Sequence, residues 1–436
     1  MLQNFQEHIN KNFPFLKDKK LLIAISGGLD SVVLSHLFYK LNYTIYLAHC
    51  NFKLRGTESN LDEDFIKKNF QKTSNQIFTI KFNTSNFAKE NKISTQVAAR
   101  ELRYNWFQEL IKKHQLDYIL TAHHADDNLE TFLINLTRGS GLEGFTGIPA
   151  INQNIIRPLL PFSRKEIFAY AKLHNLKWRE DESNSETKYI RNKIRLEIVP
   201  KLKEINPSLL NSFQNSIHFL QESKQIIDDK IDEVRNKVLT QKDDVITIDI
   251  EKINQLSNPK AYLFHLLKEY HFTEWNDVSN LLLAQNGKQI LSKTHRLIKD
   301  RTSLILISRN STVATKKFFI PENKKSINEP FPLSFIEKDS TFSTKTSEIV
   351  LDKDLLNFPL ILRKWEKGDY FYPTGMRGKK KVSKFFKDEK FSLLDKEKTW
   401  ILANNNNDVI WIINYRKDRR FVAKENTINK LKLITT

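Results

Sequence analysis

One short stretch, Leu21–Ser31, places the strongest constraint on how this chain can fold. It reads LLIAISGGLDS: an unbroken apolar run, a turn containing two glycines, and the start of a segment whose apolar residues have helical spacing. A short apolar run that ends at glycines is typical of a strand buried on both faces of a parallel sheet. A strand, a glycine turn and a helix in this order aim free backbone N–H groups and the positive end of the helix dipole at one point. The stretch therefore predicts an anion-binding site.

Strands and helices alternate through the residues that follow. We expect further strands at Thr44–His49, Gln76–Phe82 and Asp117–His123, a last strand near Ile155, and helices near Leu61–Thr73 and Ser94–His114. This alternation predicts an α/β fold with a doubly wound, mostly parallel sheet and right-handed crossovers. Ligands bind such sheets beyond the carboxyl ends of the strands. Three of the expected strands end in polar residues, Ser26, His49 and His123, although His49 alone would be equally well explained as a satisfied histidine at the sheet edge.

Carboxylates follow the fourth expected strand. Asp127 and Glu130 are three residues apart, so a helix places both on one face. Together they could bind a cationic amine, take a proton from it, or hold Mg²⁺. Simple capping of the helix explains acidic residues in its first turn equally well.

Pairs of arginines at helical spacing could bind phosphate. Arg100 and Arg103 are three apart and could lean towards an anion from the edge of their helix, although such arginines usually form a solvated rim. Arg191 and Arg195 are four apart, so a helix would stack both guanidinium groups on one face. Four of the 11 glycines of the chain fall between residues 138 and 149, where they indicate tight turns or close approach to a ligand.

The charge balance indicates a polyanionic partner. The chain has 70 basic and 51 acidic residues, and nucleic acid is favoured over a membrane surface because no lipidation signal or strongly basic amphipathic helix is evident. No apolar run approaches the ~18–20 residues that span a bilayer. The single cysteine, Cys50, excludes intrachain disulfides and a cysteine zinc cluster and suits a reducing, cytoplasmic environment. We expect it to act as a small buried apolar residue.

The sequence after residue 206 divides into two further regions. Asn206-Pro207-Ser208 marks a boundary, after which residues 207–310 are expected to form a mainly helical domain with short strands at Val245–Ile250 and Leu304–Ile307. A connector leads to a small α+β domain at residues 350–436. The domains expected are thus 1–206, 207–310 and 350–436.

The last of these regions contains the most basic stretch of the chain. Between Arg363 and Lys390 there are 10 basic and 4 acidic residues, with aromatic residues interleaved. Lysines beside aromatic rings suit contact with an RNA backbone. A solvated face is the commoner explanation of a charge run, and it stays open for Lys379, Lys380 and Lys381.

Several of these motifs resemble those of a known family. SGGLDS lacks the Lys-Ser/Thr of a Walker A loop, and it resembles the SGGxDS signature of the PP-loop ATP-pyrophosphatase family, whose members split ATP between the α and β phosphates. Within that family, AARELRY, HHADDNLET, GSGLEGFTGIP and the pair D-x-S-N…R-N-x-I-R are similar to the tRNA(Ile)-lysidine synthetase branch. The match covers about the first 200 residues in the same order, and the layout around residues 363–386 is similar to the C-terminal domain of that branch. One departure is Asn128, where the branch commonly has Gln.

The resemblance implies an ATP-dependent ligase that modifies tRNA. ATP would adenylate C2 of the wobble cytidine of an isoleucine tRNA with a CAU anticodon and release pyrophosphate, and the amine of free lysine would then displace AMP. The residues implied for ATP are Ser26, Gly27, Gly28, Leu29, Asp30, Ser31 and His49, with Asp30 also holding Mg²⁺. Asp127 and Glu130 would orient and deprotonate the amine, and Arg100 and Arg191 would neutralise phosphate. The residues implied for tRNA are Arg103, Arg195, Lys379, Lys380 and Lys381.

Two other functions fit parts of the sequence. A PP-loop tRNA thiolase is disfavoured because one cysteine cannot supply a paired-cysteine sulfur relay or the ligands of an iron–sulfur cluster. An RNA-binding protein on a decayed enzyme scaffold is disfavoured because SGGLDS and DDNLE are intact. Exchange of ATP with pyrophosphate in the presence of tRNA separates an enzyme from such a binding protein.

Overall fold

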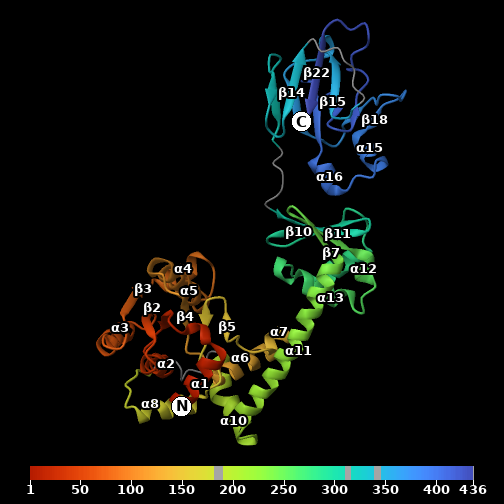
Figure 1. The fold of residues 1–436 in the computed structure, drawn as a ribbon. Coiled ribbons are helices and arrows are strands. Elements are labelled where there is room, and N and C mark those ends of the chain that lie inside the picture. Colours follow the sequence, from red (N-terminus) through yellow and green to blue (C-terminus); the bar gives the residue numbers. More distant parts are fainter. Residues whose placement is uncertain (181–189, 310–315, 338–344, 436) are drawn as a thin grey trace. The chain divides into compact units, whose positions relative to one another are not determined.

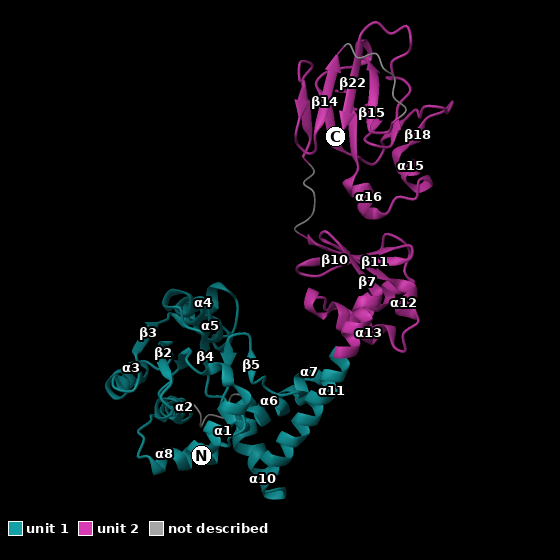
Figure 2. Cartoon of the chain, viewed as in Figure 1, with its two compact units in different colours: residues 1–228 teal, residues 229–436 magenta. Residues whose placement is uncertain are grey.

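The structure is a computed structural model that divides into two compact units, residues 1–228 and 229–436 (Figure 2). It describes residues 1–180, 190–309, 316–337 and 345–435. The division falls inside a helix, between Asp228 and Asp229, whereas the expected boundary at residue 206 lies just before that helix. The finer division into three domains stays a prediction.

A six-stranded sheet forms the centre of the first unit, with the order β3-β2-β1-β4-β6-β5 (Figure 1). Its strands are β1 (Lys20–Ala24), β2 (Thr44–Asn51), β3 (Gln76–Lys81), β4 (Tyr118–Leu120), β5 (Ile151–Asn152) and β6 (Ile155–Ile156). Ile23 on β1 pairs in parallel with Leu47 on one side and Leu120 on the other. Only the edge strand β5 runs antiparallel to its neighbour in this sheet. The predicted doubly wound, mostly parallel sheet is confirmed.

Helices cover both faces of this sheet. Neighbouring residues of a strand point to opposite sides, so a strand that is apolar throughout has two faces to bury. Leu21 and Ile23 pack into a core with α1, α2, α3 and α8, whereas Leu22 between them packs with Phe107 and its neighbours on α5. The helices are α1 (Leu2–Asn12), α2 (Leu29–Lys40), α3 (Thr57–Phe70), α4 (Thr84–Glu90), α5 (Thr95–His114), α6 (Ala125–Thr137), α7 (Leu142–Phe145), α8 (Arg164–Leu173), α9 (Ile190–Lys193), a π-helical turn (Ile194–Ile198), α10 (Val199–Ile205) and α11 (Leu209–Val238).

The second unit begins with the end of α11, which leads into a five-stranded antiparallel sheet of order β7-β8-β11-β10-β9. Its elements are β7 (Leu239–Lys242), β8 (Val245–Asp249), α12 (Ile250–Asn254), α13 (Pro259–Leu267), α14 (Trp275–Asn280), β9 (Gln289–Leu291), β10 (His295–Asp300) and β11 (Ser303–Ser308). The sequence predicted β8 and β11 but not the other three strands. In β10, charged or polar residues flank Leu297 and Ile298 on both sides and leave no clear alternation.

The remaining part of the second unit consists mainly of antiparallel strands. One sheet has the order β12-β16-β19-β20-β21, a second has the order β13-β14-β22-β15, and β17 pairs with β18. The strands are β12 (Phe318–Ile320), β13 (Ser326–Ile327), β14 (Leu333–Glu337), β15 (Glu348–Asp352), β16 (Leu360–Lys364), β17 (Tyr370–Phe371), β18 (Lys380–Lys381), β19 (Trp400–Ala403), β20 (Val409–Ile412), β21 (Arg416–Lys417) and β22 (Lys430–Thr435). The helices are α15 (Val382–Asp388) and α16 (Leu393–Lys398). The expected mixture of strands and short helices is confirmed, with strands dominant.

In the part of the chain that the structure describes, no helix is long and apolar enough to cross a membrane.

Candidate active site

The glycine turn between β1 and α2 is held in shape by its own serines. The Ser26 hydroxyl accepts a hydrogen bond from the backbone N–H of Gly28 at 3.2 Å, and the Ser31 hydroxyl donates to the Gly28 carbonyl at 2.9 Å. Gly27 has φ +89°, a conformation that side chains other than glycine's rarely adopt. The turn is therefore preformed at the N-terminus of α2, where unpaired N–H groups favour an anion.

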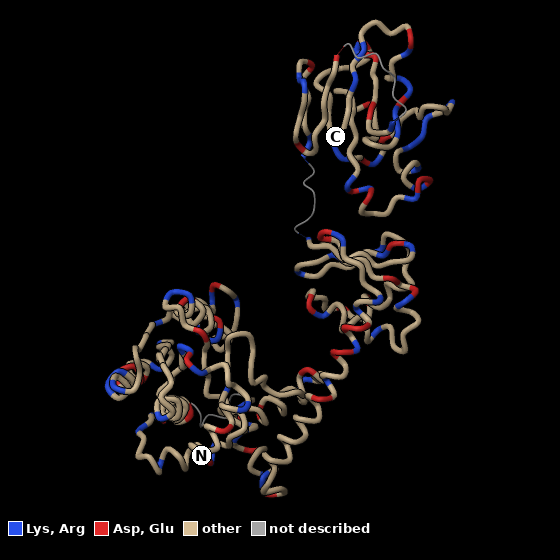
Figure 3. The backbone as a smooth tube through the Cα atoms, viewed as in Figure 1, with Lys and Arg blue, Asp and Glu red and all other residues tan. Residues whose placement is uncertain are grey.

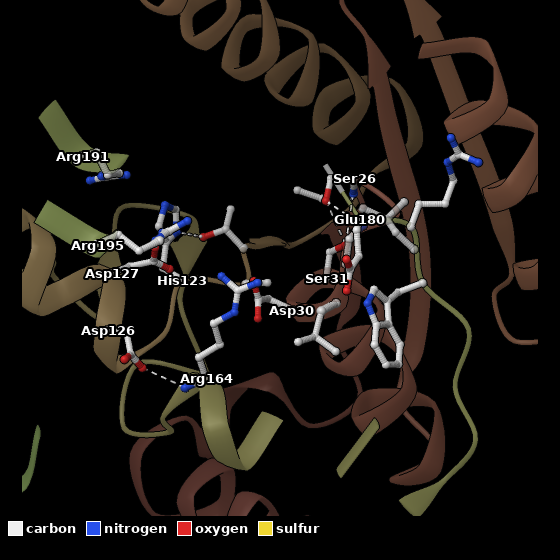
Figure 4. A pocket seen from close by; sticks show the side chains of 18 of the residues that line it. Ser26, Asp30, Ser31, His123, Asp126, Asp127, Arg164, Glu180, Arg191 and Arg195 are labelled. Carbon is white, nitrogen blue, oxygen red and sulfur yellow. Dashed lines mark hydrogen bonds and ion pairs between the residues drawn. The ribbon is translucent and has the colours of Figure 1, made fainter. Parts of the chain in front are cut away.

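A cavity of about 1480 Å³ lies at this edge of the sheet (Figure 4). Of the residues predicted for the site, those that line it are Ser26, Gly28, Leu29, Asp30, Ser31, Arg103, Asp127, Glu130, Arg191 and Arg195. The structure thus brings the glycine turn, the carboxylates of α6 and the two arginines near residue 193 to one cavity, although they are up to 169 positions apart in the sequence.

Three residues predicted for the site in this unit, Gly27, His49 and Arg100, are not among the described residues that line the cavity. His49 is buried, and its Nδ1 lies 3.0 Å from the Ile25 carbonyl oxygen. Burial lowers the pKa of His49, so the ring is held neutral at the sheet edge. The exposed Arg100 guanidinium lies 5.0 Å from the centre of the Tyr104 ring.

His124 connects the glycine turn to the carboxylates of α6. Its Nε2 lies 3.7 Å from Asp30 Oδ2 and 3.4 Å from Asp127 Oδ2, and its ring also caps α6 by accepting from the Asp127 N–H. Burial alone would lower the pKa of His124, but the hydrogen bond to Asp30 and the charges of Asp127, Asp30 and Asp126 outweigh it and raise the pKa. No role was predicted for His124 from the sequence, although it directly precedes the first residue of α6, which is the position of a helix cap.

Asp127 and Glu130 share a face of α6, as their spacing predicts, and Arg195 binds both. The Arg195 Nε lies 2.6 Å from Glu130 Oε1, and its Nη2 lies 2.9 Å from Glu130 Oε2 and 3.2 Å from Asp127 Oδ1. Arg191 donates to the Thr131 hydroxyl at 2.9 Å, with its Nε 3.8 Å from Glu130 Oε2. Both arginines therefore lie against the carboxylates of α6.

His123 points into the same cavity (Figure 4). Its Nδ1 lies 3.0 Å from the Thr121 hydroxyl. Burial lowers the pKa of His123 to about 4, with further lowering by Arg157, Arg191 and Arg100. The His123 ring is therefore neutral at ordinary pH.

The surroundings of Asp30 fit a magnesium ion. Its side chain is 29% exposed, so it is half-buried, and its Oδ1 is buried without a hydrogen-bond partner among the described residues. The described residues contain no group of three or more His, Cys, Asp or Glu that could hold a metal ion. Mg²⁺ commonly takes one or two carboxylates and completes its shell with water and substrate phosphate. Asp30 therefore suits an ion that arrives with a nucleotide.

Two buried carboxylates that sequence analysis left without a role hold neighbouring segments at the cavity. Asp62 binds Arg55 and Arg179, and the Arg179 N–H donates to the Gly27 carbonyl at 3.0 Å. Asp126 binds the Lys203 ammonium at 2.6 Å and accepts from the Arg164 N–H at 2.8 Å. Apart from the Arg55–Asp62 pair, these contacts join residues more than 30 positions apart, so no local pattern signals them.

The glycine-rich segment 138–149 is anchored to α6 by Asn128. The Asn128 Oδ1 accepts from the Ile148 N–H at 2.6 Å. Gly147 has φ +77°, and a Cβ at this position would lie 2.6 Å from Asn128 Oδ1. Glycine at 147 is required for both reasons, and the amide at 128 fixes the segment's path.

The residues predicted to contact tRNA lie in different surroundings. Arg103 lies 5.2 Å from the centre of the Phe52 ring at the cavity. In the second unit, Lys379 lies 5.3 Å from the centre of the Tyr370 ring, Lys380 pairs with Asp388 at 2.8 Å, and Lys381 is exposed. Figure 3 marks the lysines and arginines along the backbone of both units. The motif residues Asp181, Glu182, Ser183, Asn184 and Tyr189 lie outside the described residues.

The parallel sheet, the preformed glycine turn and the charged cavity define a PP-loop ATP-utilising enzyme, and comparison with known families agrees. Residues 1–202 match the PP-loop domain, and residues 241–309 match the TilS substrate binding domain. The tRNA(Ile)-lysidine synthases of Bacteroides thetaiotaomicron and Parabacteroides distasonis are each 38% identical to this chain. The first match covers 98% of this chain and 97% of the relative, and the second covers 98% of both. The Porphyromonas gingivalis (strain W83) enzyme is 34% identical over 94% of this chain and 92% of its own. The chain belongs to the tRNA(Ile)-lysidine synthase family.

Proposed function

We propose that this protein joins free lysine to C2 of the wobble cytidine of an isoleucine tRNA, using ATP, to form lysidine. The observation that carries the proposal is that one cavity holds both an anion site, at the glycine turn, and a cluster of carboxylates and arginines on α6 and near residue 193. The relatives at 38% identity over nearly the whole chain support the same reaction through their name.

In the first step, the glycine turn and the N-terminus of α2 hold the phosphates of ATP. The O2 oxygen of the cytidine attacks the α-phosphorus, and pyrophosphate leaves. Asp30 holds Mg²⁺, which neutralises charge on the phosphates when bound. The chain's own contribution is to position the two substrates and to stabilise charge on the phosphoryl group. Arg100, Arg103 and Arg191 supply positive charge for the adenylate and for the RNA backbone.

In the second step, the amine of lysine attacks C2 and AMP leaves. A protonated ammonium cannot attack, so a base must take its proton. Asp127 and Glu130 face the cavity together, and burial raises the pKa of Glu130 even though Arg195 opposes the shift. A carboxylate with a raised pKa accepts a proton more readily, so Glu130 is the proposed base and Asp127 orients the amine. Arg195 holds both carboxylates in place.

The second unit contributes tRNA binding in this proposal. The match of residues 241–309 to a substrate binding domain supports this role. Lys379, Lys380 and Lys381 are proposed to contact the tRNA backbone, and the domain limits 1–206, 207–310 and 350–436 are proposed as the functional divisions.

The proposal is tested by mass analysis of isoleucine tRNA after incubation with the protein, ATP and lysine. The expected product is heavier than the unmodified tRNA by the mass of one lysine minus that of one water. It should not form when lysine or ATP is left out. An unchanged tRNA mass would contradict the proposal. Addition of sulfur in the presence of a sulfur donor would indicate a thiolase instead. If tRNA-dependent exchange between ATP and pyrophosphate is also absent, the chain is a binding protein.

A further inference from the structure

Helix α8 carries a row of basic and aromatic side chains at the cavity. Arg164, Phe168 and Lys172 follow one another at intervals of four residues, which places them on one face of the helix. All three are exposed, with Phe168 at 44%. Arg164 and Phe168 line the cavity, together with Lys165, and the Arg164 side chain extends into it (Figure 4). The row therefore lies where a bound substrate can reach it.

Trp178 completes this surface. Its ring centre lies 5.8 Å from that of Phe168, with the ring planes at 74°, and Trp178 also lines the cavity. The indole is half-buried against the core of the first unit, which fixes its position. The Lys172 ammonium lies 5.4 Å from the centre of each ring. We refer to Arg164, Lys165, Phe168, Lys172 and Trp178 as the α8 platform.

The cations of the α8 platform differ from most other cations at the cavity in their ion pairing. Arg179, Arg195 and Lys203 are each held in an ion pair by a carboxylate. Arg164, Lys165 and Lys172 form no ion pair with any residue that the structure describes. The single acid of α8, Glu166, is bound by Ser163 at the helix cap. The platform thus combines an exposed aromatic pair with positive charge that is available to a ligand.

We propose that the α8 platform binds one or two nucleotides of the anticodon loop of the substrate tRNA by stacking their bases and neutralising their phosphates. This rests on the proposed function. Proteins recognise single-stranded RNA loops by stacking unpaired bases on aromatic or guanidinium planes, with basic residues on the backbone. The platform offers both groups at the cavity, which Arg164, Lys165, Phe168 and Trp178 line. A loop held there is brought to the glycine turn, where the adenylation is proposed to take place.

The first test removes the exposed ring. Phe168→Ala should weaken binding of an RNA hairpin with the anticodon arm of isoleucine tRNA by about tenfold or more, and Phe168→Tyr should restore it, since stacking tolerates either ring. Leu173→Ala is the matched control, because Leu173 is 77% exposed on the same helix and lies off the row. Binding is measured by fluorescence anisotropy at one salt concentration, and the KM for ATP is measured beside it. Equal RNA affinity in Phe168→Ala and wild type overturns the proposal. A raised KM for ATP with unchanged RNA affinity also overturns it, and would indicate that the ring stacks on adenine.

The second test concerns the cations. Arg164→Ala/Lys165→Ala/Lys172→Ala should flatten the slope of log affinity for the hairpin against log salt by up to about two units, at ~0.7 for each single-strand phosphate neutralised. An unchanged slope overturns the charge contribution. Both tests are decided by RNA affinity and not by turnover, so they separate the platform from the chemistry. If Phe168→Ala loses RNA affinity but the wild type forms no lysidine, the platform is supported and the proposed function is contradicted.

Discussion

Arg195 holds Glu130 through both oxygens of its carboxylate, at 2.6 and 2.9 Å, although the two residues are 65 positions apart in the sequence. A buried carboxylate bound in this way is kept in one orientation. Burial raises the pKa of Glu130, and the hydrogen bond and charge of Arg195 lower it only in part. The geometry and protonation of Glu130 therefore depend on Arg195, and a substrate amine must approach carboxylates that already have a cationic partner.

The first prediction separates the two chemical steps. Asp127→Asn keeps the side chain's size but removes the charge that faces the amine. We expect lysine incorporation to fall about 100-fold or more, the cost known for misplacing a reacting group by about 1 Å, and tRNA adenylation to fall much less. Single-turnover assays of AMP-linked tRNA and of lysidine measure the two steps. Glu109→Gln, on the exposed side of α5, is the control. An equal loss in both steps would place Asp127 at the metal instead.

The second prediction concerns Asp30 in the glycine turn. Asp30→Ala should lower adenylation at least about 100-fold, comparable to the loss of one electrostatic group in other active sites. The midpoint of urea unfolding should stay close to that of wild type, because Asp30 Oδ1 has no hydrogen-bond partner among the described residues and Asp127 lies nearer than Asp30 to His124 Nε2, at 3.4 against 3.7 Å. Normal adenylation by the folded variant would remove Asp30 from the site.

The third prediction concerns Lys379, Lys380 and Lys381. Replacing all three with Ala should weaken binding of cognate and non-cognate tRNA alike, because phosphate contacts carry no sequence information. The slope of log affinity against log salt should flatten by up to about two units, at ~0.7–0.9 for each phosphate. Lys112→Ala/Lys113→Ala at the end of α5 is the control. A slope equal to that of wild type would mean that these lysines form a solvated face.

The fourth prediction concerns Gly147. Gly147→Ala should destabilise the first unit by about 1–3 kcal/mol, since it combines a strained backbone with a Cβ only 2.6 Å from Asn128 Oδ1. Gly141→Ala is the matched control, because Gly141 has φ −79° and nothing within 4 Å of an added Cβ. Its expected cost is below about 1 kcal/mol, from loss of a glycine cap. Urea unfolding of both variants checks the difference, and equal stabilities would contradict the contact.

The fifth prediction concerns the pH dependence at Asp126. Burial by itself would raise the pKa of Asp126, but the Arg164 N–H and the Lys203 ammonium outweigh it and hold the pKa below 3.8. A lowered pKa in the folded state gives stability that is present above about pH 4 and is lost as the pH falls through the folded value. Asp126→Asn should therefore be less stable than wild type at pH 6–8, with a smaller difference near pH 3. A constant difference across this range would contradict the ion pair.

Local patterns predicted the parts of the molecule that depend on local physics. The β1 strand, the glycine turn and the shared face of Asp127 and Glu130 follow from apolar runs, glycine and helical spacing. Partners brought together by the tertiary fold could not be predicted in this way. The contact of Arg195 with Glu130 spans 65 positions, and that of Arg179 with Gly27 spans 152 positions, while the tRNA contact expected of Arg195 stays a prediction. β10 was missed because its apolar pair is too short to show a period.

Cys50 has a practical consequence for labelling studies. Burial raises the pKa of its thiol to about 12, so very little of it is the reactive thiolate at pH 7, although the side chain is half-buried and lines the cavity. It is also the single cysteine of the chain. Maleimide dyes should therefore react only slowly with Cys50 in the native protein. A cysteine introduced on the exposed surface should be labelled first, while Cys50 stays in place. Fluorescent reporters of RNA binding can then be attached wherever an experiment requires them.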